Sequence, residues 1–135
     1  MSRLALDTSA AVPLLLRRHP EHEAVRAAVV GATICLTSHS QAETYSVLTR
    51  LPGDARLDAH DAATLLSTGF ARPLPLDPVT AADLPSILAA QEIAGGAVYD
   101  AMVGLATVDT AFTLLTRDRR AAATYAALDI QFRFV

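Results

Sequence analysis

Short apolar stretches that alternate with helical patterns constrain this chain more than any other feature of its sequence. The first stretch, Arg3 to Leu6, ends at Asp7, and two hydroxyl residues and a helical composition follow at once. The other expected strands are 33–37, 73–76 (an edge strand, because of its prolines), 113–116 and 130–134. Strands separated by helices predict an α/β fold whose central, mostly parallel sheet carries helices on both faces.

The stretches between these strands predict the helices. We expect helices over 10–18, 23–30, 40–51, 59–70, 80–93, 97–108 and 118–128. Pro13 fits the first of them poorly, since proline is comfortable only in a first helical turn, so this helix should start late or bend. Pro52 to Asp58 is the expected mobile loop, and it is too short to link two domains. A chain of 135 residues is therefore expected to form a single domain over residues 1–135.

The charged residues and the cysteine exclude several kinds of site. The net charge is −3, so the chain is not a basic nucleic-acid coat, and all 11 basic residues are arginine. Every mechanism that needs a catalytic lysine is therefore excluded. The single Cys35 allows neither an internal disulfide nor a Cys-rich zinc site, and its apolar neighbours predict a buried thiol. No apolar run approaches the ~18 residues that span a bilayer, and no signal peptide precedes Asp7, so we expect a cytoplasmic protein without membrane contact.

Four acidic residues fall at places that such a fold could bring to one crevice, although for Asp100 this requires its helix to pass beside the crevice, which the sequence alone does not show. Asp7 and Asp118 each follow an apolar strand, and the carboxyl ends of parallel strands share one edge of the sheet. Glu43 lies in the first turns of the helix after the second strand, and Asp100 lies inside a helix. Taken singly, Asp7 and Asp118 are equally good helix caps, and Ser40-x-x-Glu43 has the form of a capping box. Asp100 lies past any cap, so it belongs to a solvated face or to a site.

Taken together, these segments resemble a known family. Their sequences are Leu6-Asp7-Thr8-Ser9-Ala10, Ala42-Glu43, Tyr99-Asp100-Ala101 and Leu115-Thr116-Arg117-Asp118. In order and separation they resemble the four acidic positions of PIN-domain proteins of the VapC type, which are toxin ribonucleases of type II toxin–antitoxin systems. The resemblance covers essentially the whole chain, and Pro13 is a departure from the smooth first helix usual in the family. It implies a PIN-like fold, Mg²⁺ or Mn²⁺ as cofactor, endonucleolytic cleavage of RNA, a homodimer, and a small antitoxin protein that covers the cleft.

The chemistry of carboxylates agrees with this resemblance. Clustered carboxylates repel one another in a partly dry cleft, so their pKa values should rise unless a cation is present. Hard oxygen ligands favour Mg²⁺ or Mn²⁺ over zinc, and such an ion activates water for attack on phosphorus. We expect Asp7 and Asp100 to be the main ligands, with Glu43 and Asp118 completing the site or holding waters.

Other residues near the acids have two interpretations each. Three residues supply hydroxyls that either fix carboxylate rotamers or serve as ordinary turn and cap groups: Thr8, Ser9 and Thr116. Three arginines either contact RNA phosphates or acids of a partner, or belong to a solvated helix start: Arg117, Arg119 and Arg120. The histidines show no ligand spacing and are expected on the surface; they are His19, His22, His39 and His60. The helices expected to grip the partner are 40–51 and 59–70.

Three alternatives remain. Haloacid-dehalogenase-type phosphatases need a lysine and a second aspartate two residues after the first, where Ser9 stands. Receiver domains pair their acidic pocket with a lysine, which this chain lacks. The third alternative is a non-catalytic PIN-like module that binds RNA or a protein without cutting, and the presence of all four acids argues against it.

Overall fold

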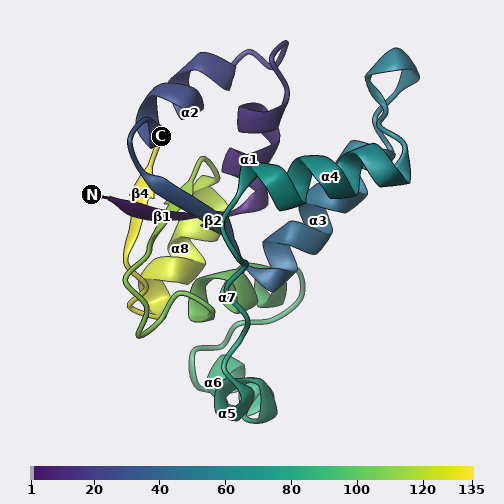
Figure 1. The fold of residues 1–135 in the computed structure, drawn as a ribbon. Coiled ribbons are helices and arrows are strands. Elements are labelled where there is room, and N and C mark those ends of the chain that lie inside the picture. The colour runs from purple at the N-terminus through teal and green to yellow at the C-terminus, as the bar shows by residue number, and fades with distance from the viewer. Residues whose placement is uncertain (1) are drawn as a thin grey trace.

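Four short strands form one parallel sheet in the computed structural model, which describes residues 2–135 (Figure 1). In the order β2-β1-β3-β4, they are β2 (Thr33–Leu36), β1 (Arg3–Leu6), β3 (Thr113–Thr116) and β4 (Phe132–Phe134). Every neighbouring pair is parallel, and Leu6 lies between Leu36 of β2 and Leu115 of β3. Parallel strands need crossover connections, and helices supply them. The predicted α/β fold is confirmed.

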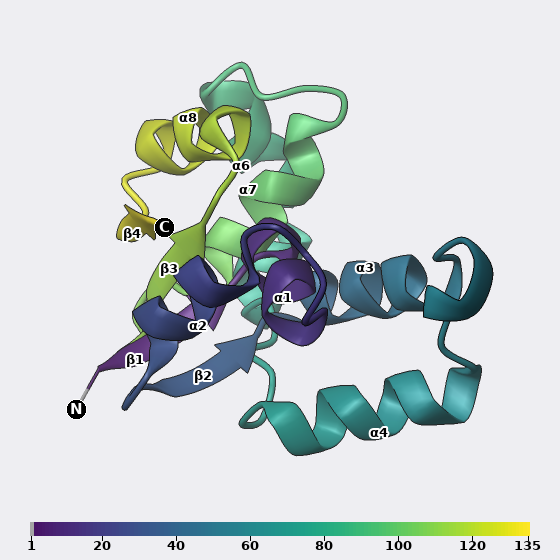
Figure 2. The same ribbon diagram turned by 90° about the horizontal axis from the view of Figure 1, so that it is seen from above.

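Helices connect the strands, and most of them cover one or the other face of this sheet. They are α1 (Thr8–Leu15), α2 (His22–Val29), α3 (Ser38–Thr49), α4 (Ala59–Gly69), α5 (Pro78–Ala82), α6 (Leu84–Ala90), α7 (Ala97–Leu105) and α8 (Arg119–Ala127). Because successive strand residues point to opposite faces, Leu4 and Leu6 pack with α1 to α4, whereas Ala5 packs with α7 and α8. Figure 2 shows α1 and α2 on one side of the strands and α7 and α8 on the other.

Helices α3 and α4 lie side by side and extend away from the sheet (Figures 1 and 2). The chain between them contains a single 3₁₀ turn, Gly53–Ala55, within the segment expected to be a loop. Leu48 and Leu66 are buried where the two helices join the core. Within residues 2–135, no helix combines the length and the apolar character that crossing a bilayer requires.

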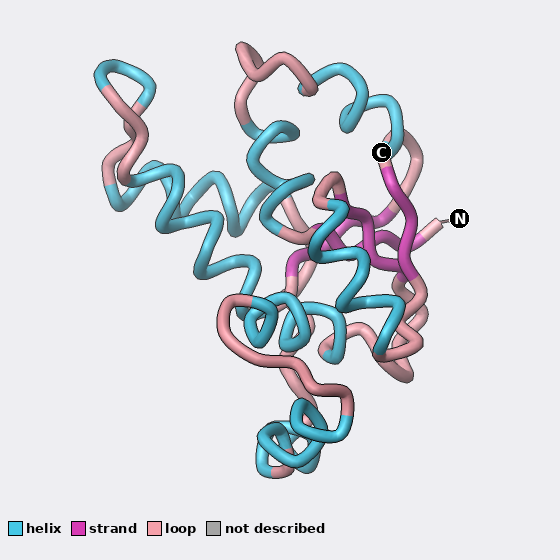
Figure 3. The backbone as a smooth tube through the Cα atoms, turned by 180° about the vertical axis from the view of Figure 1, so that it is seen from behind, coloured by secondary structure: helices cyan, strands magenta, loops and turns pink. Residues whose placement is uncertain are grey.

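The helix expected over 80–93 is wrong in its extent, because the structure contains two shorter helices there. Asp83 ends α5 and begins α6, and Pro85 lies in the first turn of α6. Proline has no N–H to bond the carbonyl four residues back, so a continuous helix through this point is disfavoured. Both helices lie away from the sheet at the end of an extended connection (Figures 1 and 3).

Two other proline-containing segments also differ from expectation. The segment expected as an edge strand over 73–76 makes only an isolated bridge between Thr37 and Leu74, although the Leu74 N–H does bond to the Leu36 carbonyl at the sheet edge. Its prolines cannot donate to a continuous ladder. Helix α1 starts at Thr8, earlier than expected, and ends two residues after Pro13. The missing N–H of Pro13 removes one helical hydrogen bond, which agrees with so short a helix.

Candidate functional site: a pocket of four carboxylates

Asp7 lies at the carboxyl end of β1, and its side chain is almost fully buried. Its Oδ1 atom accepts hydrogen bonds from the Ser9 hydroxyl at 2.6 Å and from the Ala10 N–H at 3.2 Å, so Asp7 also caps α1. Its Oδ2 atom accepts a hydrogen bond from the Tyr125 hydroxyl at 2.9 Å. Burial raises the pKa of Asp7, and these hydrogen bonds oppose that rise because they favour the ionised form.

Glu43 lies on α3 and is not part of a capping box. The box at the start of α3 joins Thr37 and Ser40, so the expectation that Ser40 pairs with Glu43 is wrong. The Ser40 hydroxyl also donates to the Leu6 carbonyl at 3.0 Å, which fixes the start of α3 against the end of β1. Glu43 instead accepts a 2.8 Å hydrogen bond from the Thr8 hydroxyl at Oε2 and pairs with His39 Nε2 through Oε1.

Asp100 and Asp118 come from the other side of the sheet. Asp100 lies in the first turn of α7, and Asp118 caps α8 by accepting from the Arg120 N–H at 2.9 Å. A small pocket of about 80 Å³ joins all four acids; its lining residues are Asp7, Thr8, Ser9, Glu43, Asp100, Val103 and Asp118. Among the described residues 2–135, no basic side chain lines this carboxylate pocket.

The four carboxylates interact electrostatically. Burial, followed by the negative charges of Asp118, Asp7 and Glu43, raises the pKa of Asp100 to about 6. Arg120 acts in the opposite direction but does not cancel these effects. Within residues 2–135, the Asp100 carboxylate accepts no hydrogen bond that would offset its charge. Within residues 2–135, the pocket therefore gathers like charges that Arg120 and the pairing of His39 with Glu43 offset only in part.

This donor set suits a hard divalent cation in its chemistry, since all of its charged ligands are carboxylates. As the side chains stand, however, no group of three or more Asp, Glu, His or Cys residues in positions 2–135 is arranged so that it could hold a metal ion. Three of the acids are occupied by hydrogen bonds within the chain, and like charges keep carboxylates apart when no cation lies between them. The residue types therefore suit a divalent metal ion, although the side chains as they stand do not form a complete set of ligands.

Hydroxyl groups connect the acids to the sheet. The Ser9 hydroxyl lies 3.3 Å from the Thr116 hydroxyl and accepts a 2.9 Å hydrogen bond from the Arg117 N–H. The Thr116 hydroxyl also accepts from the Asp118 N–H at 3.1 Å. The three hydroxyl residues singled out from the sequence therefore all lie beside the carboxylates.

Two functional neighbours escaped the sequence analysis. Tyr125 contacts Asp7 from α8, and burial and the neighbouring carboxylate raise its pKa, which keeps the hydroxyl protonated as a donor. His39 was expected on the surface, yet its side chain is only 25% exposed, pairs with Glu43 and stacks on Tyr99. Its position four residues before Glu43 on one helix was the available sequence signal.

The three arginines near Asp118 have different partners. Arg117 donates to the Val135 carbonyl at 2.8 Å and forms a 3.3 Å ion pair with Glu21. The Arg119 guanidinium lies 5.2 Å from the centre of the Phe134 ring. Arg120 lines a second pocket of about 380 Å³ that adjoins the acids; its lining residues are Gly96, Ala97, Asp100, Asp118 and Arg120.

A parallel α/β sheet with acids at the carboxyl ends of its strands defines a class of fold with a polar crevice at that edge. The PIN domain family matches residues 4–127. The chain is 52% identical over 127 residues to Ribonuclease VapC27 of Mycobacterium tuberculosis (strain ATCC 25618 / H37Rv), covering 94% of this chain and 93% of that protein. It is 40% identical over 136 residues to Ribonuclease VapC40 of the CDC 1551 / Oshkosh strain, covering 98% of both. The chain belongs to the PIN domain family and, within it, to the VapC ribonucleases.

Solved structures agree on the fold. FitAB bound to an IR36 DNA fragment contains a chain with a TM-score of 0.73 and 22% identity, covering 97% of this chain and 94% of that one. VapBC2 from Rickettsia felis, bound to a DNA fragment from its promoter, gives a TM-score of 0.67 and 12% identity, covering 98% of both chains. At such low identity these similarities establish the fold alone.

Proposed function

We propose that the four acids of the carboxylate pocket bind Mg²⁺ or Mn²⁺, and that this VapC-type endoribonuclease, the toxin of a toxin–antitoxin pair, hydrolyses RNA there. The observation that carries the proposal is the convergence of Asp7, Glu43, Asp100 and Asp118 on one pocket, which no basic residue of the described part of the chain lines. Gathering like charges costs folding free energy, and a cation recovers that cost. Because the substrate is RNA, the proposal includes cytoplasmic localisation.

Each acid has a role in this proposal. Asp7 and Asp100 are the main ligands, and Glu43 and Asp118 complete the site or hold waters. A bound ion would supply charge stabilisation at phosphorus and lower the pKa of a bound water. The chain orients the ligand oxygens beforehand, since Ser9 and Tyr125 hold the Asp7 carboxylate and Thr8 holds that of Glu43. Orientation of this kind preserves metal affinity.

Arg120 is the proposed contact for an RNA phosphate. It lines the pocket that adjoins Asp100 and Asp118, and a guanidinium matches the geometry of a phosphate. Arg117 and Arg119 are secondary candidates, because Arg117 already pairs with Glu21 and Arg119 lies over Phe134.

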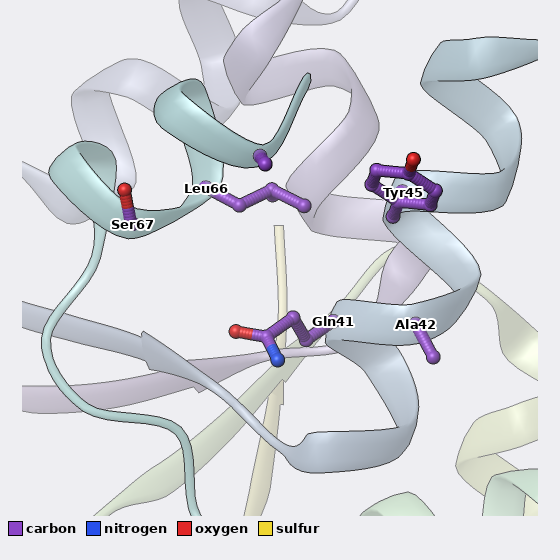
Figure 4. A pocket seen from close by; sticks show the side chains of 6 residues that line it. Gln41, Ala42, Tyr45, Leu66 and Ser67 are labelled. Carbon is purple, nitrogen blue, oxygen red and sulfur yellow. The ribbon is translucent and has the colours of Figure 1, made fainter. Parts of the chain in front are cut away.

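The partner surface that we propose lies between α3 and α4. A groove of about 360 Å³ separates these helices; its lining residues are Gln41, Ala42, Tyr45, Ala63, Leu66 and Ser67 (Figure 4). Most of the groove surface is apolar, and Leu66 forms part of its floor. An amphipathic segment of a small antitoxin would bury this surface, as helix-in-groove recognition does. We further propose that the toxin forms a homodimer.

A metal titration combined with a cleavage assay tests the proposal. Cleavage of a structured RNA should stop in EDTA and return when excess Mg²⁺ or Mn²⁺ is added. Mn²⁺ binding, followed by calorimetry without RNA, should be lost in Asp100→Asn and kept in Asp109→Asn, which removes an exposed acid outside the pocket. Cleavage that persists in chelator after dialysis would contradict the metal assignment, and equal Mn²⁺ binding by both variants would contradict the ligand assignment.

A further inference from the structure

The side chain of Tyr99 occupies an unusual position next to the carboxylate pocket. It is 54% exposed although it is large and aromatic. Its ring lies parallel to that of His39, with 5.3 Å between the ring centres and 8° between the planes. Single exposed apolar side chains are common and need no explanation. A solvent-facing ring held flat against a second ring is a more specific arrangement, because it presents one fixed aromatic face.

The two rings are held by the site itself. His39 pairs with Glu43 one turn further along α3, which limits the rotation of the imidazole. Tyr99 directly precedes Asp100 on α7, and α3 packs against α7. The stacked pair therefore bridges two helices that each carry an acid of the pocket: His39 pairs with Glu43 on α3, and Tyr99 directly precedes Asp100 on α7.

The negative charge of the carboxylate pocket repels RNA phosphates, and stacking of a base on Tyr99 is an interaction that this repulsion does not affect. Four carboxylates repel phosphates, and the chain has no lysine to offset them. Arg120 lines the adjoining pocket, and a single guanidinium there would contact only a small part of an RNA backbone. The face of a nucleobase is uncharged. Stacking on an aromatic ring can therefore hold a base near the acids without electrostatic repulsion between the base and the carboxylates.

We propose that Tyr99, held flat against His39, is a stacking platform for one unpaired RNA base next to the carboxylate pocket. This inference rests on the proposed ribonuclease function and makes Tyr99 a positioning residue. The base must be unpaired, since both faces of a base inside a duplex are covered by its neighbours, whereas bases in loops and single strands are free to stack on protein side chains.

Binding in chelator tests the platform without cleavage. The probe is a short single-stranded RNA that contains 2-aminopurine, whose fluorescence is quenched by stacking. Tyr99→Leu should weaken its binding by roughly 5- to 150-fold, the range expected for one base stacked on an aromatic ring. Tyr99→Phe and Tyr99→Trp should bind within about twofold of wild type or more tightly, because both keep the aromatic face. The control is Phe112→Leu, which replaces an aromatic residue just before the amino end of β3, whereas the pocket lies at the carboxyl ends of the strands; this variant should leave binding unchanged.

Two results would overturn the platform. One is Tyr99→Leu protein that remains folded by circular dichroism and quenches the probe like wild type. The other is loss of binding in the Phe and Trp variants equal to that in the Leu variant, which would assign the effect to packing around Asp100. The same RNA annealed to its complement should bind without dependence on Tyr99, and equal dependence for the duplex would contradict the unpaired-base requirement.

Kinetics with Mg²⁺ separate this proposal from the proposed function. Tyr99→Leu should raise KM while kcat stays within a few-fold, since stacking holds ground state and transition state alike. A loss confined to kcat would overturn the positioning role. If wild type cuts no RNA but the probe still binds with the expected dependence on Tyr99, the nuclease proposal fails and the stacking platform stands. If cleavage requires metal but probe binding does not depend on Tyr99, the nuclease proposal stands and the stacking platform fails.

Discussion

Tyr125 and Asp7 lie 118 positions apart in the chain, and the Tyr125 hydroxyl donates a 2.9 Å hydrogen bond to Asp7 Oδ2. Tyr125 has no exposed surface and Asp7 is 5% exposed, so this bond lies in the interior. It connects α8, near the end of the chain, to the first strand. The orientation of an acid at the start of the sequence thus depends on the folding of its last helix.

Tyr125→Phe should destabilise the protein by about 1–3 kcal/mol, because it leaves a buried carboxylate oxygen without its donor. The donor favours ionised Asp7, so its removal raises the pKa of Asp7 further, and the stability loss should be larger at neutral pH than in acid. Urea unfolding at both pH values measures this difference. Tyr45→Phe, which removes an exposed hydroxyl, is the control and should stay within about 0.5 kcal/mol. An equal loss at both pH values would show that the bond does not act through the charge of Asp7.

Ser9→Ala should lower the affinity for Mn²⁺ by roughly 10- to 100-fold, the usual cost of losing a residue that orients a metal ligand. The Ser9 hydroxyl donates to Asp7 at 2.6 Å and accepts from the Arg117 N–H at 2.9 Å, so alanine frees the carboxylate and a backbone donor together. Calorimetric titration with Mn²⁺ in the absence of RNA measures the effect. Ser46→Ala, on the exposed side of α3, should bind like wild type. Unchanged affinity in Ser9→Ala would make Ser9 an ordinary turn residue.

Strands β1 and β3 and the placement of Asp7 and Asp118 could be predicted because both depend on local patterns, whereas the sequence did not show that α7 brings Asp100 to the pocket. Apolar runs locate β1 and β3, and the geometry of parallel strands brings their following acids, Asp7 and Asp118, to one edge. Tyr125 could not be predicted in the same way. An aromatic residue in an alanine-rich helix signals burial, but only the folded chain specifies which buried group receives its hydroxyl.

The start of α3 shows why local rules leave some choices open. Two overlapping pairs, Thr37 with Ser40 and Ser40 with Glu43, have the spacing of a capping box, and residue preference favours the second because it ends in glutamate. The structure selects the first, since the Ser40 hydroxyl also reaches the Leu6 carbonyl at 3.0 Å. A long-range bond thus decides the helix start and leaves Glu43 available to the pocket.

Cys35 should not react with iodoacetamide in the native protein. Its side chain has no exposed surface, and burial raises the pKa of the thiol to about 12, so almost no thiolate exists at neutral pH. The sequence prediction of a buried thiol is confirmed. Labelling followed by mass spectrometry should be slow in buffer and fast in denaturant. Rapid native labelling would mean that the core on the α7 and α8 side of the sheet opens readily.

Because Asp100 lies among other acids, Asp100→Asn should stabilise the metal-free protein at neutral pH rather than destabilise it. Burial and the neighbouring acids raise the pKa of Asp100 from 3.8 to about 6. The folded state therefore binds its proton more tightly than the unfolded state, so stability falls as pH rises from about 4 to 6, and the penalty is complete at neutral pH. After discounting for solvent screening of this partly buried group, removal of the charge is worth about 1 kcal/mol. Asp7 suits this test less well, because its carboxylate accepts three hydrogen bonds.

Thermal unfolding in EDTA measures this gain. Asp100→Asn should melt a few degrees above wild type at neutral pH, and the difference should vanish below about pH 4, where Asp100 is protonated in both states. Added Mg²⁺ should reverse the order, because the ion binds the folded wild type and stabilises it by mass action while the variant gains much less. Asp109→Asn should track wild type in both conditions, since Asp109 is exposed and outside the pocket. A variant that melts below wild type in EDTA at every pH would mean that Asp100 supports the fold, and the repulsion on which the metal proposal depends would then be too weak to matter.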